Sequence, residues 1–345
     1  MNQSGIYVPF DRRFPPESMP PKPETTFRGQ VDTLAAPLVM PVSWRPPDIP
    51  SAMERNHREI VMRQKTLQFF TLILLSAILT VAAQAATKQE MATVINLAGK
   101  QRMLTQKMSK EALLIAKGID VQANRENLRN TADLFDRTLK GLIQGDAQLG
   151  LPATTDPAIL AQLDKVNGLW QQFKPNIEAV LKGDTGKPVL ESIAKQNLPL
   201  LKNMNAAVQM YAKASGSSLD PAVATTINLA GKQRMLTQKM TKELLLVANG
   251  IAPEANREAL AGTRALFDRT LKGLLDGDAK LGLPGTRDPA IRKQLTVVQQ
   301  LWSEYQPVLA AVDTSKTGLE TAARLNLPLL KEMNKAVKMY EAAVK

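Results

Sequence analysis

The 345-residue sequence has no cysteine and a single histidine, His57. The lack of cysteine excludes disulfides, a thiolate nucleophile and a cysteine-liganded metal. Aromatic residues are also scarce, at 4% of the chain, whereas alanine, leucine, lysine and glutamine are abundant. Because the abundant residues favour helices and the scarce ones favour strands, the composition predicts an all-α protein.

Signals of catalysis are equally few. The sequence contains no recognisable metal-ligand cluster and no glycine-rich phosphate loop. Asp133 and Asp136 lie three residues apart, but Arg129 and Arg137 are close enough to neutralise them. We therefore expect a protein that is not an enzyme and that uses no cofactor.

The most informative feature is an internal repeat. The segment INLAGKQRMLTQKM occupies residues 95–108 and returns unchanged at residues 227–240. An offset of 132 relates most of the two copies, and it falls to 129 near their ends. A deletion in a surface loop explains this change, because loops tolerate changes of length. The repeat predicts two helical modules, at residues 88–215 and 220–345.

Each module contains four stretches with helical signals. In the first module these begin with residues 88–117 and 121–144. Asp156 and Pro157 provide an N-cap and a first-turn proline for the third helix, and the same pair returns in the second module. Four prolines in the later stretches should kink or end the helix locally: Pro175, Pro199, Pro307 and Pro328. Amphipathic helices with short connections predict an antiparallel four-helix bundle in each module.

Residues 67–86 form an uncharged run, LQFFTLILLSAILTVAAQAA. As a helix, this run is long enough to cross a hydrocarbon core of about 30 Å. We predict a single transmembrane helix that continues into the first helix of the first module. A cleaved signal peptide is the alternative, because Ala83-Gln84-Ala85 has the form of a cleavage site. The basic residues ahead of the run place the N-terminal side in the cytoplasm under the positive-inside rule.

The segment ahead of this run, residues 1–66, is rich in proline. Half of the 22 prolines fall within the first fifty residues, with no period of apolar residues. We expect a disordered cytoplasmic tail with polyproline II stretches. Such a tail is either a solvated tether or a docking peptide for a cytoplasmic partner.

The repeated motif combines apolar, cationic and amide side chains on one helix. Its apolar residues, such as Ile95 and Met103, predict a buried stripe, and its lysines are expected to project toward solvent. Arg102 lies four residues before Gln106, so that the guanidinium and the amide share a helix face. Such a group can clamp a small oxyanion, or it can hold helices together.

The candidate binding residues are the same in both copies of the motif. The predicted ligands of an anion or a phospholipid headgroup are Lys100, Arg102, Lys107, Lys110, Lys232, Arg234, Lys239 and Lys242. The predicted supporting polar residues are Asn96, Gln101, Gln106, Asn228, Gln233 and Gln238. The methionines beside them are expected to fill the core and not to bind metal.

At this motif the sequence resembles the ligand-sensing modules of bacterial transducers, both the PilJ type of type IV pilus chemoreceptors and the nitrate-sensor type of NarX-like kinases. The resemblance is carried by Ile95-Asn96-Leu97-Ala98-Gly99, Gln101-Arg102-Met103-Leu104 and Gln106, and by the same set from Ile227. It implies an extracytoplasmic four-helix bundle in which Arg102 meets a small anion at a helix interface. Sensors of that kind pass their signal to an output module. We expect none in this chain, so sensing would need a partner.

The order of a tail, one anchor and helical bundles also resembles magnetosome-associated proteins of the MamY type, which tubulate liposomes. Residues 67–215 and 216–345 each carry five more basic than acidic residues. A basic helical surface tethered to a membrane suits anionic headgroups such as cardiolipin. The implied function is a self-associating scaffold that binds anionic phospholipids and shapes or tubulates membrane, as in magnetosome vesicle formation.

Three functional hypotheses follow. The first is the membrane scaffold, and the second is a sensor subunit that binds a nitrate-like anion through Arg102 and Arg234 and signals through a partner. The third is an adaptor between a cytoplasmic and an extracytoplasmic partner. In each case we expect a bacterial inner membrane, or an organelle membrane derived from it, with the bundles periplasmic or lumenal. Nucleic acid is not an expected partner, because the span would place the bundles outside the cytoplasm.

Overall fold

The computed structural model describes residue 62 and residues 86–344. Within this part of the chain the protein is all-helical, as predicted, and contains no strand. The first repeat contains α2 (Lys88–Ala116), α3 (Val121–Gln144), α4 (Pro157–Leu181) and α5 (Lys187–Ala214). The second contains α6 (Pro221–Ala248), α7 (Pro253–Asp276), α8 (Pro289–Ala311) and α9 (Lys316–Ala342). Short 3-10 turns precede α4, α6 and α8.

The predicted tail and the predicted membrane span lie outside the described residues, apart from Met62 and Ala86. In the described part of the chain, no helix combines the length and the apolar character that crossing a membrane requires.

Helix α2 begins at a capping box. The hydroxyl of Thr87 accepts a hydrogen bond from the backbone N–H of Glu90, and the carboxylate of Glu90 accepts one from the backbone N–H of Thr87 at 2.8 Å. This reciprocal pair satisfies two N–H groups that a helix start leaves without partners. Ala86 and Thr87 are not helical. The prediction that a membrane helix continues without a break into this helix is therefore wrong.

Aspartate followed by proline starts three of the helices. Asp156, Asp220 and Asp288 each accept hydrogen bonds from the first two backbone N–H groups available in α4, α6 and α8. Proline at the first helical position lacks an N–H and has a backbone angle already suited to a helix. These helix starts agree with the sequence prediction, because the signals that set them are local.

The internal prolines do not end their helices. Pro175 and Pro199 lie inside α4 and α5, and Pro307 and Pro328 lie inside α8 and α9. All four occupy exposed positions, so water can hydrate the carbonyl that each proline leaves without an N–H partner. Termination, one of the two predicted outcomes, is wrong, because packing of the opposite face carries each helix through; a local kink at these prolines stays a prediction.

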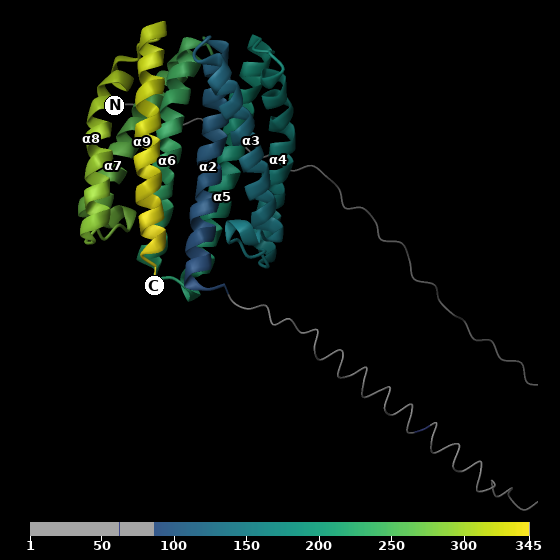
Figure 1. The fold of residues 1–345 in the computed structure, drawn as a ribbon, viewed down its shortest axis with the longest axis vertical. Coiled ribbons are helices and arrows are strands. Elements are labelled where there is room, and N and C mark those ends of the chain that lie inside the picture. Colours follow the sequence, from purple (N-terminus) through teal and green to yellow (C-terminus); the bar gives the residue numbers. More distant parts are fainter. Residues whose placement is uncertain (1–61, 63–85, 345) are drawn as a thin grey trace, which may run out of the picture. The chain divides into compact units, whose positions relative to one another are not determined.

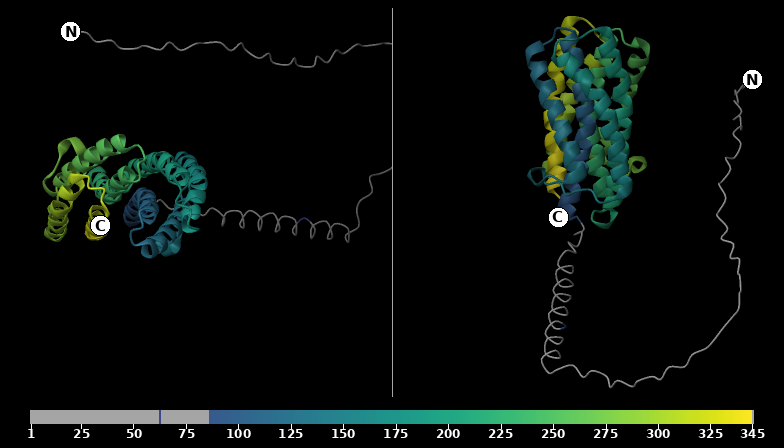
Figure 2. Two further views of the ribbon diagram at one scale, coloured as in Figure 1. Left: turned by 90° about the horizontal axis from the view of Figure 1, so that it is seen from above. Right: turned by 90° about the vertical axis from the view of Figure 1, so that its right-hand side faces the viewer.

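The helices of each repeat pack as expected of a helical bundle. In the first repeat α2 contacts α3 and α5, and α4 contacts α5; the second repeat has the same neighbours among α6, α7, α8 and α9. The long helices lie along a common direction in Figure 1, and the view from above in Figure 2 shows them end-on. The most extensive contact of all joins α2 to α6, one helix from each repeat.

An aromatic cluster fills the outer part of each repeat. The indole of Trp170 packs on Phe135, with 4.7 Å between ring centroids, and Trp302 packs on Phe267 at 4.4 Å. Each indole N–H donates to an aspartate on the neighbouring helix, so the buried polar atom has a partner. The rings of the first cluster lie on α3 and α4 and those of the second on α7 and α8, so neither cluster lies on the two helices of the α2 and α6 contact.

Candidate functional site

The repeated motif lies where α2 meets α6, and most of its polar residues are buried. Arg102, Arg234 and the four motif glutamines are each at most 1% exposed. On an isolated helix these residues would form a polar face, but here helices of the same repeat and one helix of the other repeat cover them together. We call this contact between α2 and α6 the inter-repeat seam.

Arg102 joins both repeats. Its Nη1 donates to Asn205 Oδ1 on α5 at 2.7 Å, within its own repeat. Its Nη2 donates to the backbone carbonyl of Asn228 on α6 at 3.0 Å, across the seam. The guanidinium is thus bound to one amide oxygen and one main-chain oxygen.

Arg234 repeats this arrangement in the opposite direction. Its Nη1 donates to Asn334 Oδ1 on α9 at 2.9 Å, and its Nη2 donates to the backbone carbonyl of Asn96 on α2 at 3.1 Å. The pattern is reciprocal: Asn228 lies six positions before Arg234, and Asn96 lies six positions before Arg102. The two halves of the seam are related as the two halves of a symmetric dimer are.

The two guanidiniums lie close together. A Cβ atom added at Gly99 would be 3.3 Å from the Nη2 of Arg102 and 3.8 Å from the Nη2 of Arg234, and Gly231 has the same relation to both. Burial, followed by the charge of Arg234, lowers the pKa of Arg102 to about 9. Both arginines stay protonated at neutral pH, so two like charges share a buried position.

The arginine pair has unused hydrogen-bond donors. The Nε atoms of Arg102 and Arg234 are buried and have no partner among the described residues. In the same part of the chain, no carboxylate forms an ion pair with either guanidinium. A buried charge without a counter-charge is costly, and a buried donor without an acceptor adds to that cost. The seam therefore has the donors and the charge that a small anion requires.

Further cations surround the pair. Lys100 and Lys232 are partly buried, and their pKa values are lowered, first by burial and next by Arg234 and Arg102 respectively. In each case the arginine that acts on the lysine belongs to the other repeat. Lys338 also lowers the pKa of Lys100. Among the described residues, Glu341 is an acidic group near the pair: its charge favours the protonated form of Arg234, and its carboxylate accepts a hydrogen bond from Asn96.

The supporting polar residues separate into three groups, of which Gln106 and Gln238 form the third, bonded to asparagines of α5 and α9. Asn96 and Asn228 lie beside the arginines and supply the carbonyls described above. Gln101 and Gln233 instead donate to the backbone carbonyls of Phe135 and Phe267, at 2.8 and 2.9 Å. These two glutamines hold α3 and α7 onto the motif helices and do not face the arginine pair.

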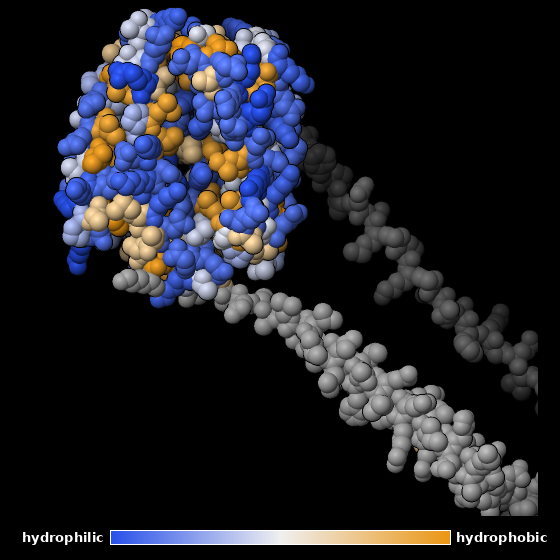
Figure 3. All heavy atoms as spheres, viewed as in Figure 1, coloured by the Kyte–Doolittle hydropathy of each residue, from blue (hydrophilic) through white to orange (hydrophobic). Residues whose placement is uncertain are grey.

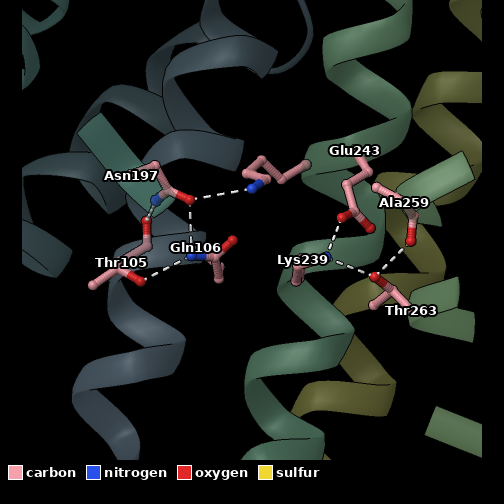
Figure 4. Close-up of polar contacts among 8 residues, drawn as sticks. Thr105, Gln106, Asn197, Lys239, Glu243, Ala259 and Thr263 are labelled. Atoms are coloured by element: carbon pink, nitrogen blue, oxygen red, sulfur yellow. Dashed lines mark hydrogen bonds and ion pairs between the residues drawn. The ribbon is translucent and has the colours of Figure 1, made fainter. Parts of the chain in front are cut away.

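A second polar layer lies two helical turns further along the seam. Asn197 Oδ1 on α5 accepts from Gln106 Nε2 at 2.9 Å and from Lys242 Nζ of the other repeat at 3.1 Å. Its Nδ2 donates to the backbone carbonyl of Thr105, as in the left half of Figure 4. Asn326 on α9 has the same role toward Gln238 and Lys110, with bonds of 2.8 and 3.1 Å.

The motif lysines do not form a solvent-exposed basic face. Lys110 and Lys242 are 3% exposed, and Lys107 and Lys239 retain 17% and 19% of their side-chain exposure while pairing with Glu111 and Glu243. The prediction that these lysines project toward solvent is wrong, because neighbouring helices cover them: Lys110 bonds to Asn326 of α9, and Lys107 bonds to Thr131 of α3. The face of the molecule drawn in Figure 3 is mostly hydrophilic, with separate groups of hydrophobic residues.

Sequence analysis missed the asparagines of α5 and α9 and the acidic residues of the seam. Asn197 and Asn205 match Asn326 and Asn334 at the offset of 129. Polar residues that stay identical between the repeats, at helix positions surrounded by apolar ones, were the available signal. That signal shows which residues are buried, but it does not show which helix each one bonds to.

Comparisons with known proteins agree with the repeat. Residues 84–195 and 221–326 each match the family model described as PilJ, type IV pili methyl-accepting chemotaxis transducer N-term. Two curated relatives are a methyl-accepting chemotaxis protein, McpN, of Pseudomonas aeruginosa and a putative methyl-accepting chemotaxis protein, AlkN, of Alcanivorax borkumensis. The first is 34% identical over 119 residues, which is 34% of this chain and 22% of McpN. The second is 24% identical over 265 residues, which is 75% of this chain and 35% of AlkN. The chain thus spans well under half the length of either relative.

Proposed function

The chain belongs to the PilJ family of type IV pili chemotaxis transducer N-terminal domains, and from this membership and the inter-repeat seam we propose that it senses a small oxyanion. The family is a sensory, chemotaxis-related group of helical domains, and no enzymatic family is indicated. The chain holds two such domains in tandem. We propose that they bind one anion between them, at Arg102 and Arg234.

The observation that carries this proposal is the pair of buried guanidiniums without a carboxylate partner. Each guanidinium bonds to two neutral oxygens and keeps its Nε donor free. A planar oxyanion such as nitrate matches the planar fork of donors that a guanidinium presents. An anion between the two arginines would reduce the repulsion of their like charges and so stabilise the contact of α2 with α6.

Isothermal titration of the full-length protein with sodium nitrate tests the proposal. We expect saturable binding with one nitrate per chain, and a loss of about tenfold or more in affinity in Arg102→Gln and in Arg234→Gln. Arg137→Gln is the matched control, because Arg137 is an exposed arginine that pairs with Asp146. This control should bind nitrate as the unaltered protein does.

Two results would count against the anion site. The first is no saturable binding of nitrate, nitrite, sulfate or phosphate. The second is binding that Arg137→Gln weakens as much as Arg102→Gln does, which would indicate general charge attraction. Salt-sensitive binding spread over many lysines is the pattern that the scaffold hypothesis predicts instead.

The membrane anchor and the partners stay proposals. We propose anchoring by residues 67–86 with the N-terminus in the cytoplasm, self-association, and signalling through a partner protein of a bacterial inner membrane or a derived organelle membrane. Contact with anionic phospholipid is part of the same proposal, although the buried motif lysines cannot supply it. Sedimentation with neutral and with cardiolipin-containing liposomes, followed by electron microscopy, tests this contact and any tubulation.

A further inference from the structure

Glu341 breaks the symmetry of the inter-repeat seam. It lies in the last turn of α9, and its match in α5 of the first repeat is Ala212. A negative charge in the last turn of a helix is repelled by the free carbonyl groups at that end, so helix stability does not explain a carboxylate at this position. The surroundings of the side chain offer a better reason.

Asn96 connects Glu341 to the arginine pair. The Nδ2 of Asn96 donates to Glu341 Oε2, and its backbone carbonyl accepts from Arg234 Nη2 at 3.1 Å. Helix α9 also holds this arginine directly through Asn334, which lies about two turns before Glu341. Because Asn96 is only 5% exposed, the hydrogen bond fixes the carboxylate at the edge of a buried site.

The carboxylate of Glu341 acts on the pair through its charge. Burial is the main cause that lowers the pKa of both guanidiniums, to about 9 for Arg102 and to about 10 for Arg234. The charge of Glu341 acts in the opposite direction on Arg234. The arginine of the second repeat therefore has a negative charge nearby, and the matching position of the first repeat holds a neutral residue.

Three lysines near the pair carry the opposite charge. Lys100 and Lys232 are partly buried and Lys338 is exposed, so water and salt screen their ammonium groups. Lys338 lies on α9 three residues before Glu341, and its charge reaches Lys100. These lysines attract any anion toward the seam. Glu341 opposes that attraction, and its opposition grows with the charge of the anion.

The charge of Glu341 bears on which anions the site accepts. A monovalent anion and the Glu341 carboxylate together balance the charges of the two guanidiniums. A divalent anion at the same place exceeds that balance, and Glu341 repels it twice as strongly. We propose that Glu341 is a specificity residue of the anion site and favours monovalent over divalent oxyanions. This inference rests on the proposed function and extends it, because it states which anions the site rejects.

Isothermal titration of the full-length protein with nitrate and with sulfate tests the inference. Glu341→Gln removes the charge but keeps the size of the side chain and an oxygen that can accept from Asn96. We expect the affinity for nitrate to rise about threefold and the affinity for sulfate about tenfold, because the Coulomb energy of the divalent anion is twice as large. Each anion is compared with itself in the two proteins, so the different shapes of nitrate and sulfate do not enter. Glu341→Ala, which copies the first repeat, should give the same changes.

The reciprocal variant adds a carboxylate to the first repeat. Ala212→Glu places it at the position that matches Glu341, and it should weaken nitrate binding about threefold and sulfate binding about tenfold. Glu304→Gln is the matched control, because Glu304 is exposed on α8 and its substitution changes the net charge by the same amount as Glu341→Gln. The control should leave both affinities unchanged.

Thermal unfolding gives a second reading that needs no anion. At low ionic strength, without nitrate or sulfate, Glu341→Gln should lower the Tm by about 2 °C or more, because Arg234 loses its nearby negative charge. Glu304→Gln should leave the Tm unchanged. Saturating nitrate should reduce the difference between Glu341→Gln and the unaltered protein, since the bound anion then supplies a negative charge.

Three results would overturn the inference. They are an equal change of the nitrate and sulfate affinities in Glu341→Gln, no change in either affinity, and no sulfate binding in any of the variants. In each of these cases nitrate still binds, so the proposed function stands without the specificity role of Glu341. If the unaltered protein and every variant bind neither anion, the proposed anion site itself is wrong, and the inference fails with it.

Discussion

Lys242 of the second repeat donates a hydrogen bond to Asn197 of the first, at 3.1 Å, and both side chains are buried. Lys110 and Asn326 form the reciprocal bond at the same distance. Each of these lysines is protonated at neutral pH while bonding to a neutral amide, so folding buries two ammonium groups. This arrangement makes the stability of the protein depend on pH.

We expect the free energy of unfolding to rise between pH 8 and pH 10. Burial is the main cause that lowers the pKa of Lys110 and of Lys242 from 10.5 to about 8. In this window the unfolded chain binds more protons than the folded chain does, so raising the pH favours folding. Urea unfolding of the full-length protein at several pH values measures the slope. Above pH 10 tyrosine ionisation opposes the trend, since burial raises the pKa of Tyr211 and Tyr305 to about 12.

The double variant Lys110→Met/Lys242→Met should remove most of this slope between pH 8 and pH 9, because methionine keeps the length of the side chain without its charge; above pH 9 Arg102, whose pKa burial lowers to about 9, adds to the slope. Lys165→Met is the control, since Lys165 is exposed on α4. An unchanged slope in the double variant would show that these lysines are not its source.

Asn197→Leu should destabilise the protein by about 3 kcal/mol, because it leaves several buried groups without partners. Asn197 accepts from Gln106 and Lys242 and donates to Thr105 and Ser109. Asn167→Leu, on the exposed face of α4, should change the free energy of unfolding by less than about 0.5 kcal/mol. Chemical denaturation measures both. A similar loss of unfolding free energy in the two variants would contradict a structural role for the Asn197 side chain.

The two repeats should unfold as one cooperative unit. Separating α2 from α6 would expose the arginines, the lysines and their bonded amides together with apolar surface. In native-state hydrogen exchange under increasing urea, the slowest amides of α4 and of α8 should therefore converge on one global transition. Two transitions at different urea concentrations would show that each repeat folds independently of the seam.

Gly99→Ala should weaken nitrate binding by about tenfold, because displacing a ligand group by less than an ångström is enough to spoil a site. The added Cβ would lie 3.3 Å from the Nη2 of Arg102 and so press on the guanidinium. Gly168→Ala, which meets nothing within 4 Å, should bind nitrate normally. It should also stabilise the protein by about 1 kcal/mol through helix propensity. Calorimetric titration with nitrate and chemical unfolding are measured for both variants. Equal nitrate affinity in Gly99→Ala and Gly168→Ala would show that the close contact of residue 99 with Arg102 does not affect nitrate binding.

The helices and their starts could be predicted because their signals are local. Asp156 and Pro157 set the start of α4 without help from the rest of the chain. The surroundings of the motif could not be predicted in the same way. An amphipathic pattern assigns one buried face to a helix, whereas α2 is covered on a second face by α6. Lys110 was therefore expected in solvent and is buried instead.

A comparison of the repeats contained part of the missing information. The motif is identical at all of its positions, including its lysines and glutamines, while exposed positions such as Gln148 and Lys280 differ. When every face of a helix packs against another helix, the residues on all of its faces are expected to be identical between the two repeats. The pairing itself depends on contacts between residues more than a hundred positions apart, which no local pattern records.

Because both arginines of the seam belong to one chain, the pair forms at any protein concentration, however dilute. Two separate copies of one module would meet only above their dissociation constant, and every substitution would appear in both halves. In the tandem chain a substitution can occur in one repeat alone. Glu341 of the second repeat is an example, because the first repeat has Ala212 at the matching position. The seam is therefore a place where an inherited symmetry can be lost one residue at a time.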